Sequence, residues 1–233
     1  MMNVQRIQAI FEKDIKDFMK NMMLLMMPVI SVILALMYSR LGGGGEELPL
    51  FMIYLIVGVI FSAVTAGCIM MMMAEENEKK TLRGLALSPA SFIDILVGKS
   101  LVTGLITVVT LVISLLIVGM EPFLAIKPII GLVLLFLFFL SLGIGIGLFA
   151  KTAAATSAYM MPVMFLFGFT PMFRMLGIDE DSIVTKILEV FPLPQLIKMH
   201  DTESWMQLGI VFIWMIGAAL FMYICFRKTR TDD

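Results

Sequence analysis

The sequence has few of the groups on which soluble proteins and enzymes depend. Only 15% of its 233 residues are charged, and it contains one histidine and two cysteines. An ordinary globular domain carries about 25% charged residues. The single histidine excludes a metal site built from several histidines of one chain. No Ser-His-Asp or paired-carboxylate arrangement lies at a matching depth along the chain, so we expect no enzymatic chemistry on it and no cofactor or metal of its own.

Two apparent nucleotide-binding motifs also fail. Gly98-Lys99-Ser100 has the tail of a phosphate-binding loop, but the position five residues before Gly98, where a glycine is required, is Ile93. Gly143 and Gly147 lack the dinucleotide-binding spacing and instead form a small-xxx-small face that suits close helix packing. The sequence therefore predicts that this chain does not hydrolyse ATP.

Hydrophobic residues make up 60% of the sequence, and the mean hydropathy is +1.01. A helix that crosses the hydrocarbon core of a bilayer needs about 20 apolar residues, because no backbone polar group can stay unpaired in lipid. Six segments meet this requirement and predict an all-α polytopic membrane protein with a single transmembrane domain over residues 1–233. They are residues 22–38, 50–73, 93–118, 129–150, 153–173 and 205–226.

The distribution of basic residues indicates an orientation. If the N-terminus is cytoplasmic, twelve of the seventeen lysines and arginines face the cytoplasm, as the positive-inside rule requires. An even number of spans then places both termini in the cytoplasm, with no secretory leader, and we expect the protein in a bacterial cytoplasmic membrane. Cys68 and Cys225 lie in spans near the cytoplasmic side, where disulfides are rare, so we interpret them as packing residues.

The segment before the first span, residues 3–21, has the pattern of an amphipathic helix. Its apolar residues recur at steps of three and four and are Val4, Ile7, Phe11, Ile15, Phe18 and Met22. Lys13, Lys16 and Lys20 form a basic stripe elsewhere on the same helix. This pattern predicts a helix that lies in the cytoplasmic membrane interface.

A long external segment separates the fifth and sixth spans. Within it, Pro192 and Pro194 interrupt residues with helical spacing, and each half is too short to cross a membrane. The pattern predicts a broken helical hairpin over residues 180–200 that re-enters the outer leaflet, and a loop lying on the surface is the alternative. Backbone that does not span is tolerated at membrane depth only where protein or a wet cavity surrounds it.

Methionine is abundant, with 23 residues, and almost no ionisable residue lies between the ends of the spans. The methionines cluster at Met22, Met23, Met26, Met27, Met70 to Met73, Met160 and Met164. Thioethers can bind Cu(I), which leaves a copper path as an alternative. A consecutive run spreads around a helix, however, and favours soft packing against varied apolar substrates. Without ionisable groups at membrane depth, transport needs an outside source of energy.

The densest polar stretch, residues 75–89, forms a charged elbow between the second and third spans. Its defining residues are Glu75, Glu76, Glu78, Lys79, Lys80, Thr81, Arg83, Ser88 and Pro89. Pairs of Glu and Lys four residues apart support a short helix, which Ser88-Pro89 ends. With the amphipathic N-terminal helix, the six spans and the broken hairpin, this elbow resembles the permease subunits of the second class of ATP-binding-cassette (ABC) exporters, over essentially the whole chain.

The resemblance implies a complex of two permease chains, identical or paralogous, and two ATPase chains that bind ATP and Mg. In that family the segment matching Glu76 to Pro89 is a coupling helix seated in a cleft of the ATPase, so Glu76 and Arg83 are expected to face that partner. The apolar spans favour export of an amphipathic peptide or a hydrophobic antibiotic. Copper-related or lipid and glycan transport by the same fold, and a membrane sensor or scaffold without transport, are the alternatives.

Overall fold

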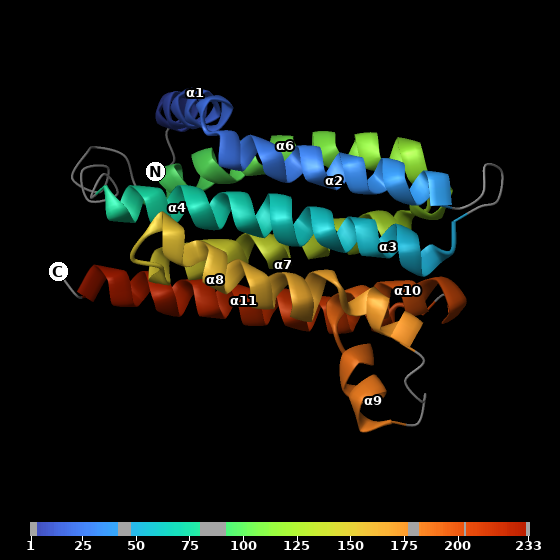
Figure 1. The fold of residues 1–233 in the computed structure, drawn as a ribbon. Helices are drawn as coiled ribbons and strands as arrows, with labels where there is room; N and C mark the ends of the chain where they lie inside the picture. The colour runs from blue at the N-terminus through green and yellow to red at the C-terminus, as the bar shows by residue number, and fades with distance from the viewer. Residues whose placement is uncertain (1–3, 42–47, 80–91, 177–181, 203, 232–233) are drawn as a thin grey trace.

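The structure, a computed structural model, describes residues 4–41, 48–79, 92–176, 182–202 and 204–231. All regular elements in these ranges are helical, which confirms the predicted all-helical class (Figure 1). In chain order they are α1 (Val4–Lys20), α2 (Met22–Leu41), α3 (Leu50–Val59), η1 (Ile60–Gly67), α4 (Cys68–Glu78), α6 (Phe92–Val118), η2 (Glu121–Phe123), α7 (Ile126–Phe149), α8 (Ala153–Val163), η3 (Met164–Gly168), η4 (Thr170–Leu176), α9 (Ile183–Glu189), α10 (Pro192–Thr202) and α11 (Met206–Thr231).

Five helices in the described part of the chain are long and apolar enough to cross a membrane. They cover Met22–Arg40, Leu50–Glu78, Ile93–Val118, Ile126–Phe149 and Met206–Lys228. The predicted span 153–173 corresponds to a shorter apolar helix, Ala153–Gly168, so the expectation of six spans is not confirmed. This helix changes to a wide π turn at Met164, and Pro171 then restricts the backbone just beyond Gly168.

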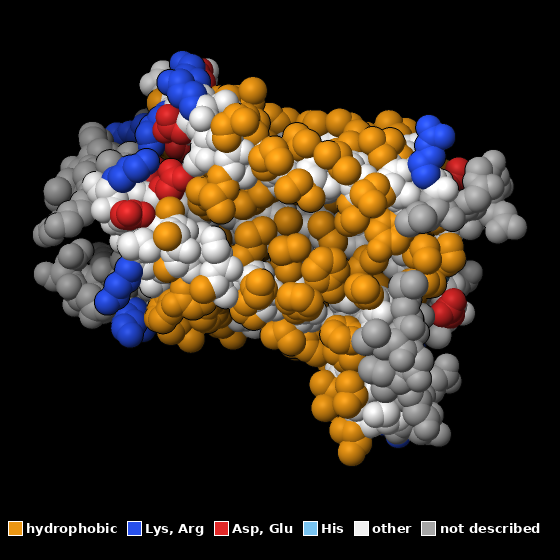
Figure 2. All heavy atoms as spheres, in the orientation of Figure 1, with side chains coloured by type: hydrophobic (Ala, Val, Ile, Leu, Met, Phe, Trp, Pro, Cys, Tyr) orange, Lys and Arg blue, Asp and Glu red, His pale blue; other side chains and the backbone are white. Residues whose placement is uncertain are grey.

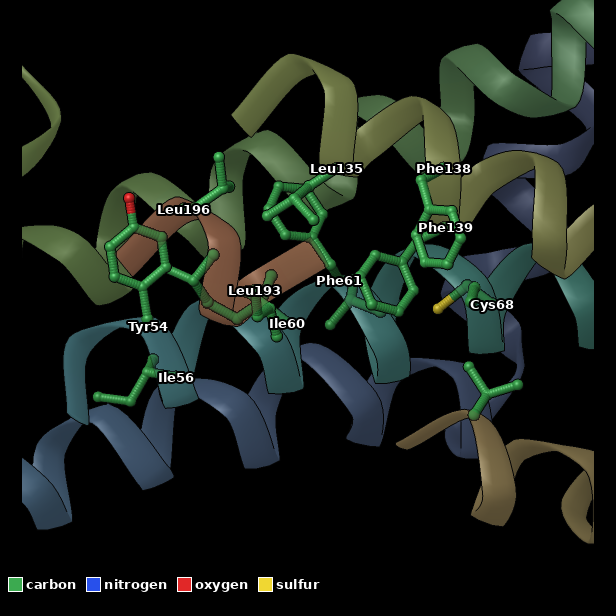
Figure 3. Packing of buried hydrophobic residues seen from close by; sticks show 14 of the residues in the cluster. Tyr54, Ile56, Ile60, Phe61, Cys68, Leu135, Phe138, Phe139, Leu193 and Leu196 are labelled. Atoms are coloured by element: carbon green, nitrogen blue, oxygen red, sulfur yellow. The ribbon is translucent and has the colours of Figure 1, made fainter. Parts of the chain in front are cut away.

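The helix from Leu50 to Glu78, formed by α3, η1 and α4, is the centre of the bundle. Every side chain from Ile53 to Ala74 is buried. The helices α2 and α6 lie on one side of it, and α7, α8 and α11 lie on the other (Figure 1). Aromatic rings fill the space beside it. Phe61 of η1 stacks on Phe139 of α7, with ring centroids 6.1 Å apart (Figure 3).

Two glycines allow the backbone of α7 to lie directly against the backbone of this central helix. A Cβ atom at Gly143 would lie 2.8 Å from Cα of Ala66, and one at Gly147 would lie 2.8 Å from the carbonyl oxygen of Met70. Real Cβ atoms do not approach backbone atoms this closely. The small-xxx-small face predicted from the sequence is therefore confirmed as the surface by which α7 contacts the central helix.

The surface divides into an apolar belt and polar ends (Figure 2). Helix α1 and the end of α11 lie at the same end of the bundle as the end of α4, and most of the charged side chains visible in this view gather there (Figures 1 and 2). We call this the charged end. The long helices run between it and the opposite end, as expected for a multi-pass membrane protein.

At the opposite end lies the predicted hairpin. Helix α9 ends at Glu189 and α10 begins at Pro192, so the predicted interruption lies at the first proline, and both prolines occupy the first turn of α10. Proline is well suited to that turn, where its missing N–H has no helical partner. Helix α10 is largely buried, whereas α9 has no buried residue. Whether the hairpin re-enters a membrane stays a prediction.

A hydrogen bond fixes α10 to the start of the central helix. The hydroxyl of Tyr54 lies 2.9 Å from Nε2 of His200, and the ring of Phe123 packs on Tyr54 at 5.2 Å. Burial lowers the pKa of the His200 imidazole, while the nearby charge of Asp201 acts in the opposite direction. The only histidine of the chain is thus a packing residue at this end.

The glycine contacts generate a matched test. Gly143→Val should push the α7 backbone away from Ala66 and lower stability by about 1–3 kcal/mol or more, as overpacking does in tight cores. Gly217→Val on α11 should have little effect, since nothing lies within 4 Å of its Cβ position. Thermal unfolding of both variants in detergent measures the difference. Equal midpoints for the two variants would contradict the close approach of α7.

Candidate functional site

The last turn of α4 is connected to several other segments of the chain. Glu75 accepts a hydrogen bond on Oε1 from Nδ2 of Asn21, at 2.7 Å, at the junction of α1 and α2. Asn77 donates from Nδ2 to the carbonyl oxygen of Ala150, at 3.0 Å, where α7 ends. Glu75 thus attaches α4 to the junction of α1 and α2, and Asn77 attaches it to the end of α7.

Glu78 extends this pattern to α8. Its Oε2 accepts a hydrogen bond from the backbone N–H of Ala153, at 2.9 Å, in the first turn of α8. Thr152 caps the same helix by accepting from the N–H of Ala155. A carboxylate at a helix N-terminus is favourable, because it faces unpaired N–H groups and the positive end of the helix dipole.

Between these residues, Glu76 takes part in a buried ionic network with Asp14, Lys13 and Lys99. Nζ of Lys99 lies 3.0 Å from Oδ2 of Asp14 and 3.0 Å from Oε1 of Glu76. Nζ of Lys13 lies 2.9 Å from the same Glu76 oxygen and 3.4 Å from Oδ1 of Asp14. The side chains of Lys99, Asp14 and Glu76 are 1%, 3% and 9% exposed. We call these four residues the ionic network; it joins α1, α4 and α6.

The ionic network contains two ammonium groups and two carboxylates, and Lys13 also lies 4.0 Å from Oδ2 of the exposed Asp17. Burying one charge alone costs several kcal/mol, and removing one partner of a buried pair typically destabilises a protein by about 3–5 kcal/mol. Each member is therefore held in place by the others. For Lys13, which is half exposed, burial lowers the pKa of the ammonium, but the hydrogen bond and charge of Glu76 and the charge of Asp14 outweigh this effect and raise it.

Local sequence explains how α1 reaches α6. Asp14 lies on the buried side of α1, with Ile10 one turn before it and Phe18 one turn after it. Gly98 precedes Lys99 on α6, and a Cβ atom there would lie 2.7 Å from Cγ2 of Ile10. The absence of a side chain at Gly98 allows α1 to lie close enough for Asp14 to meet Lys99. The Gly-Lys pair of the rejected phosphate-loop motif thus has a structural role.

A groove with a volume of about 810 Å³ lies at this end, beside the last turn of α4. It is bordered by the end of α1, the start of α2, the end of α4 and the start of α8. Its lining residues are Asp17, Lys20, Asn21, Met22, Met23, Glu75, Glu78, Lys79 and Ala153. Lys79 is the most exposed member of the Glu75–Lys79 pair, with 67% of its side chain accessible.

The elbow residues predicted from the sequence divide into two groups. Glu75, Glu76, Glu78 and Lys79 are described and lie together at the end of α4; Lys80, Thr81, Arg83, Ser88 and Pro89 lie outside the described residues. We expected Glu76 to face a partner protein, but its carboxylate is buried in the ionic network of its own chain. A role of the remaining elbow residues in contacting an ATPase stays a prediction.

The three lysines of the basic stripe of α1, Lys13, Lys16 and Lys20, are all exposed. Lys13, which is half exposed, also pairs with Glu76 and Asp14 of its own chain, which the sequence did not predict. The buried side of α1 packs on α6, whereas Val4, expected on the apolar face, is exposed. The position of α1 relative to a membrane interface stays a prediction. The predicted hairpin residues Pro192 and Pro194 lie at the opposite end and take no part in this site.

Sequence reasoning missed Asp14 and Lys99 as partners. A signal was available, because Asp14 interrupts an apolar helix face and Lys99 lies inside an apolar span. An ionisable residue at such a position requires a partner of opposite charge. This signal marks Asp14 and Lys99 as residues that need partners, but it does not say which residues those partners are.

Comparison with protein families gives one finding that covers most of the chain. Residues 45–226 match the family model described as "ABC-2 family transporter protein". The matched region begins before α3 and ends within α11, so it contains α4, Lys99 and the elbow but not α1. A search of curated proteins finds no match.

The ionic network can be tested by a double-mutant cycle. Lys99→Met should lower the thermal unfolding midpoint in detergent markedly, at a cost of about 3–5 kcal/mol, because Asp14 and Glu76 then share one ammonium group. Combining Lys99→Met with Asp14→Asn restores the balance of charge and should recover most of this loss. Lys16→Met, at an exposed lysine of α1, is the control and should behave as the wild type. If Lys99→Met alone unfolds as the wild type does, the network does not hold α1 in place.

Proposed function

The chain belongs to the ABC-2 family of transporter permeases, and from this we propose that it is the membrane-spanning subunit of an ATP-driven exporter of amphipathic or hydrophobic compounds. Members of this family are transmembrane components, so ATP hydrolysis is assigned to a separate ATPase subunit that carries ATP and Mg. We propose two copies of that subunit, together with a second permease chain, identical or paralogous, in a bacterial cytoplasmic membrane.

One observation carries the proposal that force enters at the charged end: successive residues Glu75 to Glu78 contact four different parts of the chain. An ATPase that displaced the elbow would act on α4, and through it on α1, α6, and the starts of α2 and α8. Separating the buried charges of the ionic network would cost several kcal/mol. The network therefore stays intact when α4 moves, and the displacement passes to α1 and α6. We propose that Lys79, Arg83 and the elbow between them form the contact with the ATPase.

The surfaces of the helices support the proposed substrate class. The spans present Met, Leu, Ile and Phe side chains with almost no fixed charge, which suits apolar or amphipathic molecules. Methionine adapts its shape to different partners, since it has three rotatable bonds and a polarisable sulfur. These properties support peptides or hydrophobic antibiotics as the exported compounds.

The proposed orientation places the charged end and both termini in the cytoplasm. Single cysteines at Gly44 and Ser182, in a background without Cys68 and Cys225, should react with an impermeant thiol reagent in intact cells. Cysteines at Asn77 and Thr229 should react only after the cells are opened. Labelling of Asn77→Cys or Thr229→Cys in intact cells would invert the topology and remove the cytoplasmic location of the elbow.

The coupling contact is tested by charge reversal at the elbow. The full chain purified from its native membranes should retain an ATPase subunit, and amphipathic peptides or hydrophobic antibiotics should stimulate its hydrolysis. Arg83→Glu should insert normally but lose ATPase association or stimulated hydrolysis, because a repulsion replaces an attraction across the contact.

Lys186→Glu is the matched control, since Lys186 is an exposed lysine on α9 at the opposite end. Lys127 would be a poorer control, because its ammonium lies 5.4 Å from the ring centroid of Trp205. Glu76→Lys is unsuitable, because it would also break the ionic network. Unchanged assembly and transport in Arg83→Glu would show that the elbow does not transmit force from an ATPase.

A further inference from the structure

Three sulfur atoms from three helices converge in the half of the bundle nearer the charged end. Sγ of Cys68, at the start of α4, lies 3.5 Å from Sδ of Met27 on α2. The Cβ position of the neighbouring Gly67 lies 3.3 Å from Sδ of Met27 and 3.3 Å from Sδ of Met160 on α8. Because Gly67 has no side chain, both thioethers fit against this point of the central helix. We call Met27, Cys68 and Met160 the sulfur cluster.

The ligand set of the sulfur cluster is selective. A thiolate with thioethers is a soft donor set that suits Cu(I), whereas Mg²⁺ and Ca²⁺ require oxygen ligands. Two sulfur atoms 3.5 Å apart can both bind one ion at metal–sulfur distances of about 2.3 Å. Met160 can complete a three-coordinate site, because the methionine side chain has three rotatable bonds.

The groove at the charged end borders a face of α4 that leads toward the sulfur cluster. Residues three and four apart lie on the same face of a helix. Glu78, Glu75, Met71 and Cys68 follow this spacing, so the face that borders the groove with carboxylates continues inward to the thiol. The groove is lined by three carboxylates, of Asp17, Glu75 and Glu78, and by two lysines, Lys20 and Lys79, so acidic groups are in excess by one at its entrance; Met71 lies between Glu75 and Cys68 along this helix face.

Two of the other helices that border the groove, α2 and α8, also carry a member of the sulfur cluster further along their length. Met23 lines the groove on α2, and Met27 lies one turn deeper. Ala153 lines it at the start of α8, and Met160 lies two turns deeper, on the same face. Three of the four helices that border the groove therefore carry the members of the sulfur cluster deeper in the bundle.

We propose that this chain binds one Cu(I) ion at the sulfur cluster and that the ion enters through the groove at the charged end. In the metal-free chain the Cys68 thiol donates a hydrogen bond to the Met27 sulfur. On binding, Cu(I) replaces the thiol proton, which leaves to water through the groove, and the ion keeps its oxidation state. Binding connects α2, α4 and α8 through a single ion.

This inference stands apart from export of amphipathic compounds, because the whole site lies within one permease chain and needs no ATPase. It also revises the interpretation of Cys68 as a packing residue. If the chain did not associate with an ATPase, the exporter proposal would fail but the copper site would not be contradicted. If the chain did not bind copper, the copper site would fail but the exporter proposal would not be contradicted.

The test uses the purified full chain in detergent, without oxygen, titrated with Cu(I) held by a chromophoric Cu(I) chelator. The wild type should remove one Cu(I) per chain from the chelator, and its thermal unfolding midpoint should rise with the ion, since a ligand bound only by the folded state stabilises it. X-ray absorption at the copper edge should show sulfur neighbours only. Binding should be lost in Cys68→Ser and weakened in Met27→Leu and Met160→Leu.

Two matched controls should bind as the wild type does: Cys225→Ser, which removes the other thiol, and Met26→Leu, at the exposed neighbour of Met27 on α2. Unfolding of each variant without metal shows that it is folded, and the double variant Met27→Leu with Met160→Leu replaces Cys68→Ser if that variant does not fold. No uptake by the wild type, nitrogen or oxygen neighbours at the copper, or equal uptake by the Cys68→Ser variant would each overturn the proposal.

Discussion

The burial of Lys99 determines the arrangement of the charged end. An ammonium group taken out of water must meet carboxylates at close range, since an uncompensated buried charge costs several kcal/mol. Asp14 and Glu76 supply them from two other helices, and Lys13 balances the remaining charge. This requirement links α1 to α6, and α4 to both, through ion pairs that add to the apolar packing of α1 on α6.

Within the bundle the constraint is different. Helices surrounded by lipid gain little from burying apolar surface, so close packing and interhelical hydrogen bonds decide which faces meet. Gly143 and Gly147 bring α7 onto the central helix, and Gly98 does the same for α1 on α6. The hydroxyls of Thr65 and Thr107, 2.9 Å apart, add a polar contact between η1 and α6. Among the described residues, charged side chains thus lie toward the two ends of the bundle, and the interior is held by close packing together with a few hydrogen bonds.

The sequence allowed the helices to be predicted because their apolar segments are long, and the interruption before Pro192 because proline cannot continue a helix interior. It did not show that Ala153–Gly168 falls short of spanning length, since an apolar segment looks the same whether its last turn is α or π. The partners of Glu76 and Cys68 were beyond prediction for another reason. Met27 and Cys68 are 41 positions apart, and Lys13 and Glu76 are 63 apart. Only the packing of whole helices brings such residues together.

The contacts of α4 differ in strength, and the difference locates the weakest boundary at the charged end. Its links to α1 and α6 are buried ion pairs, whose disruption costs about 3–5 kcal/mol. Its links to the junction before α2 and to α8 are single hydrogen bonds that Glu75 and Glu78 accept at the border of the groove, each worth about 1 kcal/mol, or somewhat more with a charged acceptor. By its polar contacts, α4 is therefore attached more firmly to α1 and α6 than to α2 and α8. The groove lies at this boundary, and Met27, Cys68 and Met160 lie deeper along α2, α4 and α8. An ion bound to the sulfur cluster would therefore link α4 to both of the helices from which it is most easily separated.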